Sequence, residues 1–382
     1  MKLNSKLPNV GLTIFSVMTQ LAEKHHAINL SQGFPDFDVS HELIDLVEKY
    51  MRSGANQYAP MQGVVRLREQ IAHKVKTIHG TSYDPMTEIT VTSGATEAIY
   101  AAITASVGNG DEVIVFEPAY DSYVPSILLN SGIPVYIRLR FPDYRIDWNE
   151  VKDRITSKTR AMIFNSPHNP TGSILMDSDM AALIDIVKDR NILMISDEVY
   201  EHIVFDGRQH ESMCRYPELR ERSFVISSFG KTYHTTGWKT AYCLAPAPLS
   251  QELRKIHQYL TFATNTPIQY AYADYLENQS IYQNLSTFYQ EKRDRFLSCI
   301  QDSLFKVIPS RGTYFQMLDY SEISSEPDVE FAERLTIEHQ VASIPPSVFY
   351  HNLEDNRVLR FCFAKRNETL EKAGEKLCRI SK

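Results

Sequence analysis

Apolar and polar positions alternate with two different periods along most of the chain. Short β-branched runs, typical of buried strands, are separated by stretches in which apolar residues recur with the helical period. Strands are predicted over 89–92, 111–116, 135–139, 161–164, 192–196 and 224–227, with helices over 94–106 and 178–189. Strands that alternate with helices favour an α/β fold with a mostly parallel, doubly wound sheet.

One connection breaks this alternation. The strand that ends at Ser228 is followed almost at once by a strand predicted to begin at Trp238. A crossover between parallel strands needs about a dozen residues or more. The second strand is therefore expected to run antiparallel in the sheet.

The pattern changes after about residue 284. A helix over 285–300 is followed by predicted strands near 306–308, 314–318 and 358–364, with helices over 329–339 and at the end of the chain. Near the other end, helices are predicted over 13–23 and 64–77 and a strand over 26–30. We expect a large α/β domain over 46–284 and a discontinuous, smaller α+β domain made of 1–45 and 285–382.

Composition and charge exclude several classes of function. Of the 382 residues, 43% are hydrophobic and 23% charged, as in soluble globular proteins. The net charge of -7 argues against nucleic acid or an anionic membrane as a partner. We expect no membrane span, secretory leader or metal site, because the sequence shows no long apolar run, a polar segment 1–10 and no metal-ligand spacing, and five scattered cysteines fit reduced thiols. We expect a cytoplasmic enzyme without a metal.

The segment Ser227-Ser228-Phe229-Gly230-Lys231 carries the first chemical signal. A lysine at a strand end can form a Schiff base with an aldehyde cofactor if its amine is deprotonated often enough. Asp197 follows another predicted strand, where a carboxylate can pair with a pyridinium nitrogen. With a further cation at Lys239 and nearby hydroxyls for a phosphate, these residues indicate pyridoxal phosphate.

A phosphate site is predicted where Ser93-Gly94-Ala95-Thr96 joins a strand to a helix. The first amides of a helix are free to bind an anion, and the helix dipole favours negative charge there. The same residues also fit a plain turn with a Thr cap. Because Ser228 and Lys239 belong to two other strand ends, they could reach the same dianion at the carboxyl edge of the sheet.

Further residues could bind the ring and an amino-acid substrate. Tyr200 and the amide of Asn169 could bond the ring hydroxyl and Tyr120 could stack on the ring, although a tyrosine taken alone more often serves the core or an interface. Arg360 lies in an apolar strand, where a charge needs a partner. Its planar fork matches an α-carboxylate, with a structural salt bridge as the alternative. Asn169 and the backbone of Gly33 are further candidate substrate contacts.

These motifs resemble a known family. Ser166-Pro167-His168-Asn169-Pro170-Thr171-Gly172, Ser196-Asp197-Glu198-Val199-Tyr200, the segment that ends at Lys231, and Arg360 look like the class I pyridoxal-phosphate aminotransferases of the aspartate aminotransferase fold. The resemblance covers nearly the whole chain. Segments 29–37 and 230–239 look more narrowly like the bacterial methionine aminotransferases, near the kynurenine and glutamine transaminases.

The resemblance implies roles for single residues. Lys231 would hold the cofactor covalently and then carry a proton from the substrate Cα, while Asp197 would bind the pyridine nitrogen. Tyr58 matches a tyrosine that reaches the phosphate of a neighbouring subunit, which implies a homodimer with shared active sites. Phe15 and the partner's Phe262 are candidate pocket walls, with core packing as the alternative. The remaining positions implied are Gly94, Ala95, Thr96, Ser228 and Lys239 for the phosphate, Tyr200 and Asn169 for the ring oxygen, and Arg360 for the substrate carboxylate.

Departures from the aspartate-type pattern narrow the expected substrate. Tyr120 replaces a stacking tryptophan, Lys239 replaces an arginine, and no second arginine matches a site for a side-chain carboxylate. We expect ping-pong transfer from an apolar or aromatic L-amino acid, methionine first and phenylalanine or histidine next, to a 2-oxo acid acceptor.

Three other functions are weighed against this one. A kynurenine or glutamine transaminase-like enzyme could also eliminate cysteine conjugates. A non-catalytic amino-acid sensor would carry an added DNA-binding segment. A nicotinamide dehydrogenase would need G-x-G-x-x-G after the first strand, which 94–99 does not supply.

Overall fold

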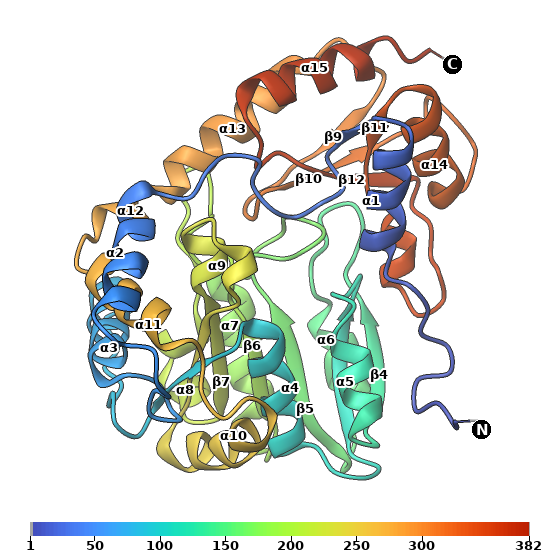
Figure 1. The fold of residues 1–382 in the computed structure, drawn as a ribbon. Helices are drawn as coiled ribbons and strands as arrows, with labels where there is room; N and C mark the ends of the chain where they lie inside the picture. The colour runs from blue at the N-terminus through green and yellow to red at the C-terminus, as the bar shows by residue number, and fades with distance from the viewer. Residues whose placement is uncertain (1–2, 382) are drawn as a thin grey trace.

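A computed structural model describes residues 3–381 and is built on a seven-stranded sheet of order β2-β8-β7-β6-β5-β3-β4 (Figure 1). All neighbouring strands are parallel except β8, which is antiparallel to both β2 and β7. The predicted mostly parallel sheet with one antiparallel strand is confirmed. The strands are β2 (Ile89–Thr92), β3 (Glu112–Glu117), β4 (Ile133–Arg138), β5 (Thr159–Asn165), β6 (Leu193–Asp197), β7 (Ser223–Ser228) and β8 (Ala241–Leu244).

The antiparallel strand begins later than predicted. Thr236–Trp238 form a 3-10 turn, and Lys239 has a left-handed backbone with φ of 52°. Strand β8 therefore starts at Ala241 rather than at Trp238. Because β8 is antiparallel, its start lies at the edge where its parallel neighbour β7 ends, so Lys239 reaches the carboxyl edge of the sheet.

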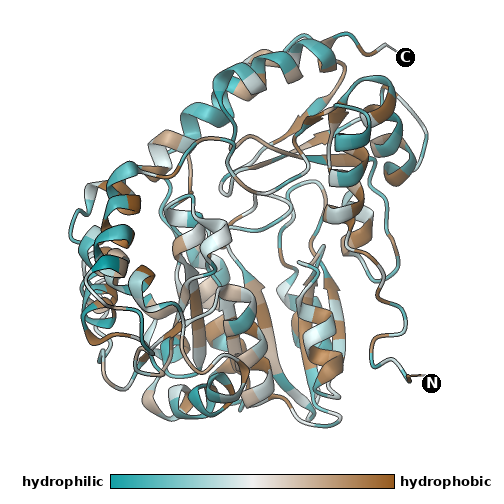
Figure 2. Ribbon diagram, in the orientation of Figure 1, coloured by the Kyte–Doolittle hydropathy of each residue, from teal (hydrophilic) through white to brown (hydrophobic). Residues whose placement is uncertain are grey.

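Both faces of this sheet are buried, which explains the continuous apolar runs of its strands. Along β3, Val113 and Val115 pack into one apolar cluster, whereas Ile114 and Phe116 pack into the other. Figure 2 shows this apolar character along the central strands. The first cluster is covered by α4 (Ala95–Ser106), α5 (Tyr123–Leu129) and α10 (Ala247–Leu260), and the second by α3 (Val65–His79), α7 (Asp177–Val187) and α11 (Thr266–Tyr275).

Two small sheets lie above the large one in Figure 1. One is antiparallel with the order β12-β10-β9, and the other pairs β1 with β11 in parallel. The second pairing joins the N-terminal segment to elements near the end of the chain. These strands are β1 (Ile28–Asn29), β9 (Lys306–Ile308), β10 (Phe315–Asp319), β11 (Val341–Ala342) and β12 (Val358–Cys362).

Helices surround the small sheets and connect them to the large one. The predicted helices near both ends are present as α1 (Ile14–Lys24), α13 (Leu285–Cys299), α14 (Asp328–Glu338) and α15 (Asn367–Cys378). None of the helices within residues 3–381 is long and apolar enough to span a membrane. The remaining helices are α2 (His41–Arg52), α6 (Trp148–Arg154), α8 (Pro217–Arg220), α9 (Phe229–Thr232) and α12 (Ser280–Gln283), with 3-10 turns at Met213–Arg215 and Pro346–Phe349.

Candidate active site

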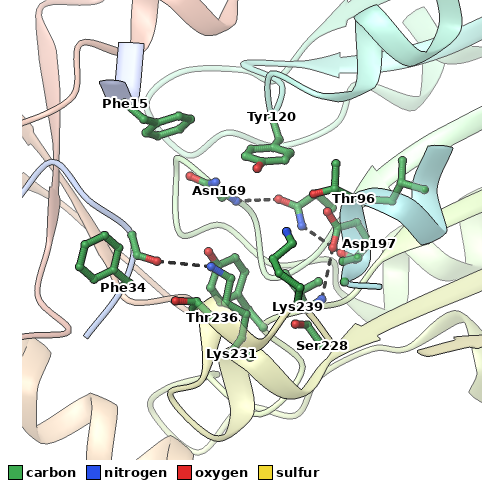
Figure 3. Close-up of a pocket in the computed structure, with 18 of the residues that line it drawn as sticks. Phe15, Phe34, Thr96, Tyr120, Asn169, Asp197, Ser228, Lys231, Thr236 and Lys239 are labelled. Atoms are coloured by element: carbon green, nitrogen blue, oxygen red, sulfur yellow. Dashed lines mark hydrogen bonds between the residues drawn. The ribbon is translucent and has the colours of Figure 1, made fainter. Parts of the chain in front are cut away.

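A cavity of about 320 Å³ opens at the carboxyl edge of the large sheet, where the N-terminal segment, β10 and β12 approach it (Figure 3). Because β6 and β7 end there and β8 begins there, residues distant in sequence share its walls. The structure brings together all the predicted site residues except Tyr58 and Phe262. Those that line the cavity are Phe15, Gly33, Gly94, Ala95, Thr96, Tyr120, Asn169, Asp197, Tyr200, Ser228, Lys231, Lys239 and Arg360.

Lys231 projects into the cavity from α9, a single helical turn that follows β7 directly. Its Nζ donates to the carbonyl oxygen of Gly33 at 3.3 Å, as Figure 3 shows, and to the hydroxyl of Tyr314 at 3.0 Å. Removal from water disfavours the charged amine and lowers the pKa of Lys231 to about 8. A nucleophilic neutral amine is therefore available near physiological pH.

Asp197 ends β6 and is 5% exposed. It accepts hydrogen bonds from the hydroxyl of Tyr123 at 2.6 Å and from the backbone N–H of Val199 at 3.3 Å. Burial nevertheless raises its pKa to about 6. A cation placed against this carboxylate would reverse that shift, because an opposite charge favours the ionised form. Tyr123 was not predicted, since nothing in its local sequence distinguishes it from a core tyrosine.

Backbone amides and a free cation meet at the start of α4. Gly94 has a φ of 81°, and a Cβ there would lie 3.3 Å from Nζ of Lys239, so glycine permits this close approach. The first amides of α4 have no acceptor within the helix. Lys239 is exposed and forms no ion pair with any residue from 3 to 381. Ser228 and the unpredicted Thr236 complete a wall suited to a dianion.

Arg360 is 0% exposed. Its Nη1 donates to Oδ1 of Asn169 and its Nη2 to the carbonyl oxygen of Ser31, both at 2.7 Å, whereas its Nε has no partner. Within the described chain no carboxylate forms an ion pair with it, so the alternative of a structural salt bridge has no partner there. Burial lowers its pKa to about 10, which still leaves a cation at neutral pH. This buried charge lacks a counter-ion.

Aromatic rings enclose the space around that arginine. The guanidinium carbon lies 4.0 Å from the ring centroid of Phe315 and 5.3 Å from that of Phe15. The ring of Phe15 is in turn 6.5 Å from Tyr120, whose pKa burial raises to about 12. The chamber next to the arginine is therefore largely apolar.

Asn169 presents one free amide group. Its Oδ1 is occupied by Arg360, and its backbone N–H donates to Oδ1 of Asn165 at 2.8 Å. Its Nδ2 makes no hydrogen bond to any described residue and is left for a ligand. The hydroxyl of Tyr200 interacts with that of Tyr314, and the two rings meet edge to face at 5.1 Å. Asn165 and Tyr314 were not predicted.

Tyr58 and Phe262 lie elsewhere on the surface. Tyr58 is 85% exposed and Phe262 44% exposed, and their rings contact each other edge to face at 5.4 Å. Neither lines the cavity of its own chain.

The donor set fits pyridoxal phosphate. The group carries an aldehyde, a pyridine nitrogen and a phosphate, and the cavity offers Lys231 for the first and Asp197 for the second. For the phosphate it offers the free amides of α4 and an unpaired lysine. The unpaired Arg360 remains for a carboxylate.

Comparison with known proteins gives a consistent result. The family model "Aminotransferase class I and II" matches residues 25–377. A methionine aminotransferase of Escherichia coli is 51% identical over 98% of this chain and 97% of its own length. A kynurenine–oxoglutarate transaminase of Dictyostelium discoideum is 35% identical over 100% of this chain and 97% of its own length.

Solved structures agree with these sequence matches. The structure of YbdL from Escherichia coli, reported as identifying a methionine aminotransferase function, superposes with a TM-score of 0.98 at 50% identity, over 100% of both chains. That of an N-succinyldiaminopimelate aminotransferase from Mycobacterium tuberculosis superposes with a TM-score of 0.95 at 36% identity, again over 100% of both chains.

Proposed function

This chain belongs to the class I and II aminotransferases, and from that premise we propose that methionine and related apolar L-amino acids are its preferred amino donors. It is an enzyme that uses pyridoxal phosphate to transfer an amino group to a 2-oxo acid. One observation carries the proposed preference. Arg360 is the sole arginine among the described residues that line the cavity, and the chamber beside it is walled by Phe15, Phe34 and Tyr120.

This arrangement selects against acidic side chains. A buried arginine without a counter-ion binds the α-carboxylate in a bidentate way. A second carboxylate on the side chain would enter an apolar chamber without a cation, which is costly. Lys231 and Lys239 do not relieve this cost, because the first serves the reacting atoms and the second faces the phosphate site. A flexible thioether or an aromatic ring fits the aromatic walls.

The residue roles follow from the chemistry of the cavity. The bound cofactor supplies a pyridine ring that withdraws electrons from the substrate Cα. Lys231, with a pKa of about 8, would take the Cα proton as a neutral amine and deliver it to the carbon of the cofactor's aldehyde group. Asp197 would keep the pyridine nitrogen protonated, and Asn169 and Tyr200 would donate to the ring oxygen. The phosphate is held by Gly94, Ala95, Thr96, Ser228 and Lys239.

The proposal includes a homodimer in which each chain completes the other's site. Tyr58 and Phe262 are exposed aromatic residues that lie outside their own cavity, which supports contact with a partner. Mixing inactive Lys231→Ala chains with weakened Tyr58→Ala chains tests this sharing. A hybrid dimer then has one site with both changes and one site with neither, so activity should recover on mixing. Activity equal to the average of the two parents would contradict shared sites.

We extend the proposal to domain organisation and location. The large domain is assigned to 46–284 and the small one to 1–45 with 285–382, supported by the separate sheets and by the pairing of β1 with β11. Limited proteolysis, with cleavage near the two junctions, tests this division. The enzyme is placed in the cytoplasm, which fractionation of cells that produce it would check.

A matrix of amino donors against 2-oxo acid acceptors tests the substrate preference. Methionine should give the highest kcat/KM, followed by phenylalanine and histidine, with aspartate lowest. A higher rate with aspartate than with methionine would contradict the proposal. The kynurenine–oxoglutarate transaminase relatives favour a second candidate, so kynurenine and cysteine conjugates belong in the matrix. Elimination would release pyruvate and ammonia from the conjugates instead of a new amino acid.

A further inference from the structure

We propose that Tyr314 is a positioning residue that holds the free amine of Lys231 with its lone pair directed toward the substrate. The inference rests on the proposed transamination, in which the lysine leaves the cofactor and becomes the base. Tyr314 directly precedes β10 and is 0% exposed. It does not line the cavity itself but contacts Lys231, which does.

Four polar atoms meet at this point, because the hydroxyl of Tyr200 also interacts with that of Tyr314. The Tyr314 hydroxyl is 2.5 Å from the carbonyl oxygen of Gly33, and Nζ of Lys231 is 3.0 Å from the hydroxyl and 3.3 Å from the same carbonyl. A carbonyl oxygen can only accept, and a tyrosine hydroxyl has a single proton. The hydroxyl of Tyr314 therefore donates to Gly33, and its oxygen is left to accept from Lys231 and from the hydroxyl of Tyr200.

These bonds fix the direction of the amine. A neutral amine has two N–H bonds and one lone pair. Tyr314 and Gly33 each accept one of the N–H bonds, so the lone pair of Lys231 points away from them and toward the cavity. A base needs this orientation to take a proton from a substrate in that cavity, because proton transfer requires hydrogen-bond geometry. Burial also holds the pKa of Tyr314 well above its usual value, so the hydroxyl keeps its proton.

Packing holds both acceptors in place. The ring of Tyr314 contacts Tyr200 at 5.1 Å and Tyr289 at 5.6 Å, and it is fully enclosed. A Cβ at Gly33 would lie 2.8 Å from the ring of Phe315, so a glycine is required for this carbonyl to approach β10. A rotation of the tyrosine or a shift of the Gly33 segment would release the amine.

The neighbouring Tyr289 provides a matched control. It is also 0% exposed, its ring contacts Tyr314, and its hydroxyl has no hydrogen-bond partner among the described residues. Tyr314→Phe and Tyr289→Phe each delete one buried hydroxyl from the same aromatic cluster. If Tyr314 only packed in the aromatic cluster, the two variants would have similar properties.

The first readout uses protein freed of cofactor. The rate of Schiff-base formation with added pyridoxal phosphate, followed against pH, reports the pKa of Lys231. Because the protonated amine loses an acceptor in Tyr314→Phe, the midpoint should fall by about 0.5 to 1 unit. Tyr289→Phe should leave it unchanged. An unchanged midpoint in Tyr314→Phe would overturn the proposal.

The second readout uses the cofactor-loaded enzyme. In Tyr314→Phe, kcat for methionine should fall about 10- to 100-fold with KM little changed, because a misdirected base slows proton transfer and leaves binding intact. The isotope effect with methionine deuterated at Cα should increase.

If the wild type transaminates no amino acid, the proposed function fails, whereas the midpoint in cofactor-free protein still decides the role of Tyr314. Should Tyr314→Phe not fold, 3-fluorotyrosine at this position keeps the shape, weakens the acceptor, and should shift the midpoint less but in the same direction.

Discussion

The structure contains two buried groups of charges, and they differ in whether their charges are paired with each other. The paired cluster consists of Lys74, Glu201 and Tyr242, in which Nζ of Lys74 lies 2.7 Å from both Oε1 of Glu201 and the hydroxyl of Tyr242. The pocket cluster consists of Asp197, Lys231 and Arg360. None of these three forms an ion pair with a residue in the described part of the chain.

The pKa directions express this difference. Burial raises the pKa of Glu201, but Lys74 and the adjacent His202 and His79 outweigh it and hold the value well below the usual range. Burial shifts each member of the pocket cluster toward its neutral form, to about 6 for Asp197, 8 for Lys231 and 10 for Arg360. Paired buried charges therefore serve the fold, whereas unpaired ones lower its stability until ligands of opposite charge bind.

The largest expected effect is that of Lys231→Ala. Loss of the amine removes both the attachment point and the base, so kcat/KM should fall by about 10⁴-fold or more. Borohydride reduction of the loaded protein should attach the cofactor to the Lys231 peptide in the wild type and leave this variant unlabelled. Lys292→Ala, which removes a partly buried lysine outside the cavity, is the control. Label on another lysine together with retained activity would contradict the assignment.

Arg360→Lys should have the next largest effect. A lysine keeps the charge but cannot bind a carboxylate in a bidentate way, so kcat/KM should fall by about 10²- to 10³-fold. The factor should be the same for methionine and phenylalanine, because the α-carboxylate is common to both. Arg366→Lys, at a largely exposed arginine, is the control. A loss that depended on the donor side chain would place Arg360 against that side chain instead.

Asp197→Asn should have a smaller effect, and one that increases the stability of the cofactor-free fold. The folded pKa of about 6 exceeds the usual value of 3.8, so this carboxylate destabilises the cofactor-free fold progressively as the pH rises through that interval. The variant should be about 1–3 kcal/mol more stable than the wild type at pH 8 and equal to it near pH 4. Denaturant unfolding at both pH values checks this, with the exposed Asp45→Asn as control. A difference independent of pH would contradict the titration.

The smallest expected effect is at the pair of Glu117 and His351, in which one side chain is buried and the other is partly exposed. Glu117 is 2% exposed and accepts from both the backbone N–H and Nδ1 of His351 at 2.7 Å, while the His351 side chain is 43% exposed. His351→Ala removes the side-chain bond and the stacking of the His351 ring on Tyr136 at 4.2 Å, both at a partly exposed site, so unfolding should become easier by about 1 kcal/mol. Thermal unfolding of the loaded enzyme measures it. A loss of about 3–5 kcal/mol in the free energy of unfolding, as expected when a buried ion pair is broken, would make this pair equivalent to the paired cluster.

Much of the fold and of the site could be predicted because the signals are local. The strands of the large sheet are continuous apolar runs, and the short connection after Ser228 revealed the antiparallel strand. Lys231, Asp197 and Arg360 stood out as charged residues at the ends of apolar runs or inside them, where a buried charge is costly unless it binds a partner. By contrast, no helix was predicted at α10, which fully buries only Ser250, Leu253 and His257.

The residues that were missed act through the tertiary structure alone. Tyr123 and Tyr314 lie in apolar surroundings among 21 tyrosines, and only folding places their hydroxyls against Asp197 and Lys231. Asn165 likewise gains its role by accepting from the backbone of Asn169. Which hydroxyl or amide meets a charge depends on loop paths that the local sequence does not encode.

The difference between the two clusters is tested most directly by the unfolding free energies of cofactor-free Lys74→Met and Arg360→Met at one pH. Lys74→Met leaves Glu201 buried without its cation and should destabilise the fold by about 3–5 kcal/mol. Arg360→Met removes a buried cation that has no counter-ion and should leave the free energy of unfolding equal to that of the wild type or higher. Equal destabilisation by the two changes would mean that Arg360 supports the fold as Lys74 does, and would contradict its assignment as the site of a substrate carboxylate.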